Sequence, residues 1–154
     1  MTKEQRASKA QDVIIIDEEA VRIPDGQYEV RLTDWQTRKI FQASKLYLNF
    51  SIVTPGPHFG KHIYRYFNVT IVGKPGRRGA FKAGLKSDFL RLFADILGWS
   101  GRPDRIPMSK LEDNVLVVQT RTVTRGSRQE ALPEPCQYSV VDKVMAAHKA
   151  WVSP

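Results

Sequence analysis

Three segments in the first half of the chain alternate between apolar and polar side chains, and this alternation constrains the fold most strongly. The segments cover residues 27–35, 45–53 and 62–72, and short polar or Pro/Gly-rich stretches separate them. A side-chain period of two places one face of a strand on a core and the other face in solvent. The pattern therefore predicts three consecutive, meandering strands that share one buried face.

One segment in the second half of the chain has the periodicity of a helix instead. The apolar positions on one face of this helix are Phe89, Leu92, Phe93, Ile96 and Leu97. A spacing of three and four residues is typical of an amphipathic helix that packs on a core. Ser87 can cap its start and Gly98 can close its end. Residues 114–124 are rich in β-branched side chains and predict a fourth long strand.

The last part of the chain allows two interpretations. Residues 136–141 can form a strand, whereas Val141, Val144, Met145 and His148 fall at helical spacing. We favour a brief strand that passes into a terminal helix.

The predicted order is three strands, a helix, a fourth strand and a further strand. This makes the chain mainly β with one or two helices. A five-stranded Greek-key barrel with a helix between its third and fourth strands has this order, and it is the oligonucleotide-binding (OB) architecture. A β-sandwich with an added helix is the competing arrangement. We expect a flexible N-terminal arm at residues 1–19, the barrel domain at 20–145 and a tail at 146–154.

Positive charge is concentrated in the middle of the chain. Residues 35–87 contain ten Lys or Arg and no Asp or Glu, whereas residues 1–34 carry a net charge of −3 and residues 88–154 a net charge of +1. Solvated surfaces usually mix both signs, because opposite charges support each other locally. A long segment without a carboxylate favours a polyanionic partner, and nucleic acid is the first candidate.

The predicted strands carry aromatic and basic side chains on the face opposite the core. Proteins that bind single strands combine a basic groove for the phosphates with aromatic rings that stack on unpaired bases. The candidate binding residues on this face and its adjoining loop are Arg31, Trp35, Arg38, Lys39, Lys45, Tyr47, His62, Tyr64 and Tyr66. Packing of the tyrosines against a neighbouring element is the alternative. A strand bulge near Trp35 would turn its ring to the other face.

Residues 73–86 are rich in Gly, Lys and Arg and predict a flexible basic loop. They do not form a Walker motif, because neither the glycine frame nor the Ser or Thr after the Lys is present. We interpret the loop as a clamp that orders on phosphates. Its candidate binding residues are Lys74, Arg77, Arg78 and Lys82. An ordinary solvated loop is the alternative.

The sequence offers no convergent set of catalytic or metal-binding residues. His58 and His62 lie inside the segment that contains no carboxylate, so no acidic ligand lies near them in sequence. Asp88 and Asp95 have no partner in a nuclease-like frame. Cys136 is the single cysteine, which permits neither an internal disulfide nor a thiolate zinc site. We therefore expect a protein that is not an enzyme and uses no cofactor or metal.

The apolar segments are too short for the roughly 18 residues that a membrane span needs. The longest apolar run near the start covers residues 13–16, and acidic residues follow it where a signal peptide would have a cleavage site. We expect a cytoplasmic protein that has no membrane partner.

Several short motifs follow one another along residues 20–145. They are PDGQYEV at 24–30, YLNF at 47–50, HFGK at 58–61, the helix at 88–98, residues 111–115 and YSVV at 138–141. In their order and spacing they resemble the small OB-fold single-strand-binding proteins of phages and integrating mobile elements. The resemblance implies protection of single strands during replication or recombination, alongside other proteins of those processes. The bacterial housekeeping proteins of this kind recruit partners through an acidic tail, which this sequence does not show.

Two functions of different classes fit these observations. The first is sequence-tolerant binding of single-stranded DNA. The second is a structural or adaptor protein whose basic face docks an acidic partner protein. An RNA-binding module is a third option, because stacking does not distinguish the sugar. Self-association into a homo-oligomer is compatible with each.

Overall fold

The computed structural model describes residues 21–99, 101, 106–126 and 128–149. The strands are β2 (Gln27–Ile40), β3 (Ala43–Ile52), β4 (His62–Asn68), β5 (Thr70–Ile71), β6 (Gly76–Arg77), β7 (Phe81–Lys82), β8 (Asn114–Val123) and β9 (Tyr138–Lys149). The helices are α3 (Asp88–Leu97), α4 (Met108–Glu112) and the short 3-10 helix η1 (Glu134–Cys136). The predicted N-terminal arm lies outside the described residues.

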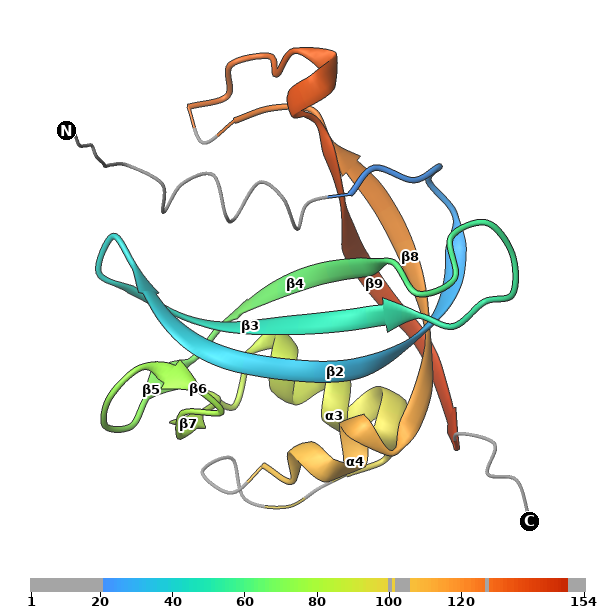
Figure 1. The fold of residues 1–154 in the computed structure, drawn as a ribbon. Coiled ribbons are helices and arrows are strands. Elements are labelled where there is room, and N and C mark those ends of the chain that lie inside the picture. The colour runs from blue at the N-terminus through green and yellow to red at the C-terminus, as the bar shows by residue number, and fades with distance from the viewer. Residues whose placement is uncertain (1–20, 100, 102–105, 127, 150–154) are drawn as a thin grey trace, which may run out of the picture.

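Five long strands form one antiparallel sheet in the order β4-β3-β2-β8-β9 (Figure 1). β2 pairs with β8 through its first residues and with β6 through its later residues. The sheet curls until its end strands β4 and β9 approach each other, but no backbone ladder joins them within the described chain. The predicted class, mainly β with two helices, is confirmed, whereas the sheet does not close into a barrel.

Arg65 of β4 bridges the gap between the two end strands. Its guanidinium Nη1 donates to the carbonyl oxygen of Val141 at 3.0 Å and also to that of Asp142. The same guanidinium lies 4.6 Å from the ring centroid of Phe67. A side chain thus partly replaces the missing ladder between β4 and β9.

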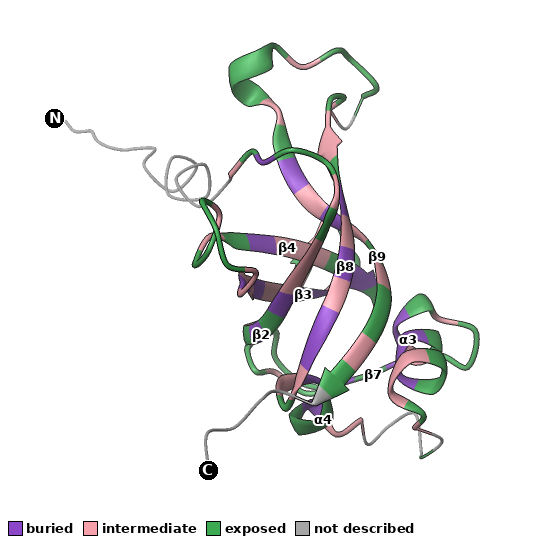
Figure 2. Ribbon diagram, turned by 90° about the vertical axis from the view of Figure 1, so that its right-hand side faces the viewer, coloured by how far each residue is buried: buried purple, intermediate pink, exposed green. Residues whose placement is uncertain are grey.

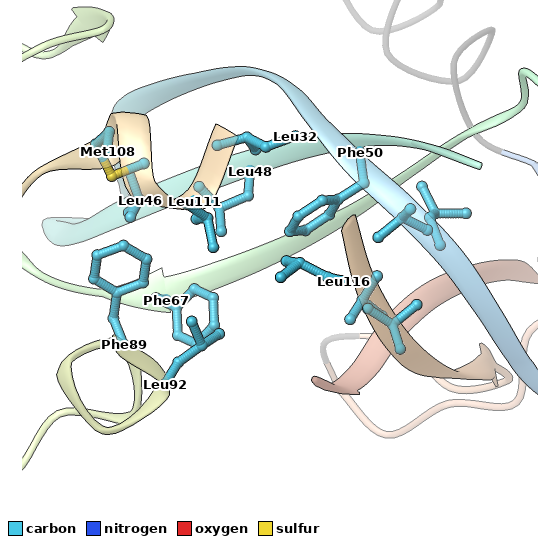
Figure 3. Close-up of a cluster of buried hydrophobic side chains, with 14 of the residues drawn as sticks. Leu32, Leu46, Leu48, Phe50, Phe67, Phe89, Leu92, Met108, Leu111 and Leu116 are labelled. Atoms are coloured by element: carbon cyan, nitrogen blue, oxygen red, sulfur yellow. The ribbon is translucent and has the colours of Figure 1, made fainter. Parts of the chain in front are cut away.

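The core lies between the inner face of the curled sheet and the helices α3 and α4 (Figure 3). The strands contribute alternate side chains, among them Val30, Leu46, Leu48, Phe50 and Ile63, and all of these are fully buried. Figure 2 shows buried positions interspersed with more exposed ones along β8. The alternation therefore predicted the buried face of the sheet correctly.

The predicted helix is α3, and its caps are those expected. The Ser87 hydroxyl accepts from the Leu90 amide at 3.2 Å, and Gly98 ends the helix with φ 67 in the left-handed region. Phe89 and Phe93 are fully buried. None of the helices in the described ranges is long and apolar enough to cross a membrane.

The predicted terminal helix is wrong, because Tyr138–Lys149 is one continuous strand. Its ladder with β8 is irregular at two places, where Asp142 and Met145 are left without a partner. Each β-bulge shifts the alternation by one residue. Val141 and Val144 therefore both pack toward the core although they are three residues apart. This spacing is the one that a helix would produce, which explains the wrong prediction. Residues 146–149 continue β9 past the expected start of the tail at residue 146.

The basic segment at residues 73–86 is more ordered than the predicted loop. β6 pairs with β2, and β7 pairs with β5. Phe81 and Ala83 are buried in the core and anchor the segment. The strand predicted at residues 62–72 therefore ends at Asn68 as β4. Thr70–Ile71 form the separate strand β5, which pairs with β7.

Candidate nucleic-acid interface

Three tyrosines form a cluster on the outer face of β3 and β4, the face opposite the core. Tyr47 stands opposite Tyr66 in the ladder, and their ring centroids are 4.6 Å apart. Tyr64 lies diagonally across, with its ring centroid 4.8 Å from that of Tyr47. Tyr47 is buried, with 8% of its surface exposed, whereas Tyr66 is 43% exposed and Tyr64 is half-buried. Tyr47 therefore supports two rings that remain accessible.

Arg38 of β2 holds this tyrosine cluster together. Its guanidinium carbon lies 4.2 Å from the Tyr47 ring centroid, and its Nη1 donates to the Tyr66 hydroxyl at 3.2 Å. Burial raises the pKa of the Tyr47 hydroxyl. Burial also raises the pKa of Tyr66, although the nearby Arg38 opposes this shift. Both hydroxyls are therefore neutral at physiological pH and add no charge that would repel a phosphate.

The tyrosine cluster forms part of the lining of a groove of about 1010 Å³, called here the tyrosine groove. Its opposite side comes from β8, β9 and η1, on the hairpin that rises beyond β4 in Figure 1. The charged residues that line it are Arg22, Arg65, Arg121 and Asp142. Arg121 donates to Asp142 at 2.9 Å. Among the described residues, three arginines against one carboxylate give the lining of the groove an excess of positive charge.

A smaller pocket of about 240 Å³ adjoins the tyrosine cluster. Tyr66 lines both this pocket and the tyrosine groove. Lys45 and Lys86 supply two cations to the pocket, and Asp88 supplies one carboxylate. The Lys45 ammonium donates to the side-chain oxygen of Asn68. We call this site the lysine pocket.

The structure brings several of the predicted binding residues to one face. Arg38, Lys45, Tyr47, Tyr64 and Tyr66 lie together around the tyrosine groove and the lysine pocket. Two others lie farther along the same face. His62 is hydrogen-bonded to Asn49 through its Nδ1 at 3.0 Å, and Arg31 donates to the backbone oxygen of Glu112 at 3.3 Å.

Trp35 is not on the outer face, as the sequence pattern had predicted. The register of β2 against β3 shifts between Leu32 and Asp34, so Trp35 stands opposite the core residue Leu48. Its ring packs edge-on against Phe81, with centroids 5.6 Å apart. The extra residue at this bulge reverses the alternation, and Trp35 becomes part of the core boundary.

Arg77 and Arg78 are held by carboxylates at the edge of β2. Arg77 pairs with Asp34 at 3.0 Å, and Arg78 pairs with both Asp34 at 3.3 Å and Glu112 at 2.9 Å. Burial opposes ionisation of Asp34, but hydrogen bonds from Arg77 and the Trp35 backbone lower the pKa of this carboxyl. The hydrogen bond to Glu112 raises the pKa of Arg78. Neither arginine lines the tyrosine groove.

The remaining candidates are surface lysines. Lys39 is exposed on the β2–β3 hairpin, and Lys74 and Lys82 are exposed on the basic segment. None of them lines the tyrosine groove or the lysine pocket.

Sequence reasoning missed several residues around the site. Arg121 and Tyr138 line the tyrosine groove, and Lys86, which belongs to the predicted basic loop but was not among its candidate residues, lines the lysine pocket. The alternation within residues 114–124 could have placed Arg121 on the outer face. Phe41 was missed because residues 36–44 read as a polar loop, whereas β2 continues to Ile40 and the hairpin turns at Phe41.

The described ranges contain no group of three or more His, Cys, Asp or Glu side chains placed to hold a metal ion. Comparison of the chain with protein-family models, with curated proteins and with solved structures found no match.

Proposed function

We propose that this protein binds single-stranded DNA without sequence preference, as a non-enzymatic binder, in the tyrosine groove. The observation that carries the proposal is the pair of accessible rings, Tyr64 and Tyr66, on the lining of a groove rich in arginine. Aromatic rings can stack on any base, and cations attract any phosphate. The arrangement therefore supports binding that tolerates sequence.

The order of the strands also supports this proposal. We infer an open, OB-like barrel, because β4-β3-β2-β8-β9 with α3 between β4 and β8 is the order of that architecture. In an OB fold the second and third strands carry much of the binding face. Those strands correspond to β3 and β4, which carry the tyrosine cluster.

A base-stacking role explains the site better than docking of an acidic protein. Acidic groups on a partner could approach the arginines that line the groove, but they would make no use of the exposed parts of the Tyr64 and Tyr66 rings. The resemblance of the short sequence motifs to phage and mobile-element proteins supports a role in protecting single strands during replication or recombination.

The test is a fluorescence-anisotropy titration with labelled oligo-dT, oligo-U and duplex DNA at two salt concentrations. We expect oligo-dT to bind most tightly and Tyr66→Ala to weaken this binding. Phe59→Ala is the matched control, because Phe59 is 64% exposed and lines neither groove nor pocket. Tighter binding to oligo-U would assign the groove to RNA, and binding to none of the three would contradict the proposal.

A further inference from the structure

Phe41 at the tip of the β2–β3 hairpin combines two unfavourable properties. Its side chain is 97% exposed, and its backbone φ is 49 in the left-handed region. Gln42, the other residue of the two-residue turn, has φ 69. Such turns favour Asn and Gly, because a side chain with a Cβ is strained at positive φ. Strain and exposure at one position indicate a function that requires the ring there.

The hairpin connects this ring to the tyrosine cluster. On the outer face, Arg38 pairs in register with Lys45, and Ile40 pairs with Ala43 next to the turn. Arg38 also contacts the Tyr47 ring. Four residues of β3 lie between Tyr47 and Gln42 of the turn, and these five steps along the chain span roughly 17 Å at the rise of a β-strand. Outer-face positions of β2 and β3 therefore lead from the tyrosine groove to the turn that carries Phe41.

The residues near Phe41 in sequence favour a ligand that is flat and negatively charged. Lys39 is exposed two residues before it, and residues 35–87 contain no carboxylate. One ring presents far less apolar area than a stable protein interface buries. A nucleobase meets these conditions, because stacking needs only one ring face and the attached phosphate meets the cations.

We propose that Phe41 stacks on a base of the same single strand that occupies the tyrosine groove, so that the binding face extends to the hairpin tip. The inference rests on the proposed function, and it adds a second contact point that only a longer strand can reach. Binding should then strengthen in two stages as the oligonucleotide grows.

The test compares the wild type with Phe41→Asn over oligo-dT lengths of about four to about sixteen nucleotides, the range of site sizes for one OB fold. Asn suits the left-handed turn, so this change removes the ring and keeps or raises the melting temperature. We expect affinity for the longest oligonucleotide to fall by about fivefold to about 150-fold. Affinity for the shortest one should not change. Phe41→Trp should keep the wild-type affinity, and Phe59→Ala is the control for loss of an exposed ring.

Equal affinity of Phe41→Asn and the wild type at every length would overturn this inference and leave the proposed function standing. An equal loss at every length would also overturn it, because the ring would then not be a distant contact point. A change in sedimentation of Phe41→Asn with unchanged affinity would assign the ring to self-association instead. If the wild type bound no single strand of any length, the proposed function itself would fail.

Discussion

The rings of Tyr47 and Tyr64 lie nearly parallel, with their centroids 4.8 Å apart and their planes 19° from parallel. Aromatic pairs at such distances across neighbouring strands stabilise a sheet. Tyr47 is buried while Tyr64 remains half-buried. The pair is therefore a stack whose outer ring is partly exposed, and we expect a base to pack against that ring.

Replacing Tyr64 with Ala should weaken oligo-dT binding by about 1–3 kcal/mol, because one stacking surface is lost. Tyr64→Phe should bind nearly as well as the wild type, since the π-face remains. Anisotropy titration of both variants measures this difference. Equal losses for the two changes would show that the hydroxyl, and not the ring, makes the contact.

Replacing Tyr47 with Ala should instead damage the fold. The side chain is buried beneath the two accessible rings and Arg38, and removal of a buried aromatic ring costs about 3–5 kcal/mol. Urea unfolding should therefore show a lower free energy of unfolding for Tyr47→Ala than for Tyr64→Ala. A midpoint equal to that of the wild type would mean that the cluster contributes little to stability.

Arg121→Gln and Arg77→Gln should differ in how binding depends on salt. Each phosphate contact on a single strand contributes about −0.7 to the slope of log K against log salt. Arg121 lines the tyrosine groove, so its loss should make the slope shallower by about one contact. Arg77 lies outside this groove, at the edge of β2, so its loss should leave the slope unchanged. A shallower slope for Arg77→Gln would support the phosphate-clamp interpretation of residues 73–86.

The ion pairs of Asp34 should make stability depend on pH in the acid range. Its folded-state pKa is lowered from 3.8, so its contribution is complete above the unfolded pKa and is lost as pH falls through the lower folded value. Thermal melts between about pH 5 and pH 2 should show this loss in the wild type. Asp34→Asn should be less stable at neutral pH and should lose less on acidification. Parallel curves for the two proteins would remove Asp34 from the explanation.

The lysine pocket offers a test in which binding should improve. Asp88 is its one carboxylate and faces the same space as Lys45 and Lys86. If a phosphate of the bound strand enters this pocket, Asp88→Asn should raise affinity and Lys86→Ala should lower it, both most clearly at low salt. Unchanged affinity in both variants would show that the strand does not pass over Tyr66 into this pocket.

The sequence was sufficient to predict the residues whose faces follow unbroken alternation. Leu46, Leu48 and Phe50 were correctly placed in the core, and Tyr64 and Tyr66 on the opposite face. The helix α3 was predicted with both of its caps, because Ser87 and Gly98 act through local backbone geometry.

The predictions failed where the ladder itself is irregular. Trp35 was assigned to the wrong face because one extra residue in β2 shifts the register, and nothing in the local side-chain types marks that position. Val141 and Val144 imitated a helix because two bulges in β9 bring them to the same face. A bulge depends on the partner strand as well as on its own residues, so a single strand's pattern cannot locate it.

The bulge in β2 affects the curvature of the strand, whereas the faces on which the following side chains lie do not depend on it. Thr33 is the extra residue between two regular stretches, so a chain that lacked it would keep Asp34 on the outer face and Trp35 on the core side. It would lose the bend just where β2 leaves β8 and turns to β6. Deletion of a residue within positions 34–39 would have a different effect. Between the deleted position and the bulge or the turn, core-facing side chains would move to the outer face and outer side chains to the core. A change in chain length at Thr33 would therefore alter the shape of the binding face but not the set of residues on that face.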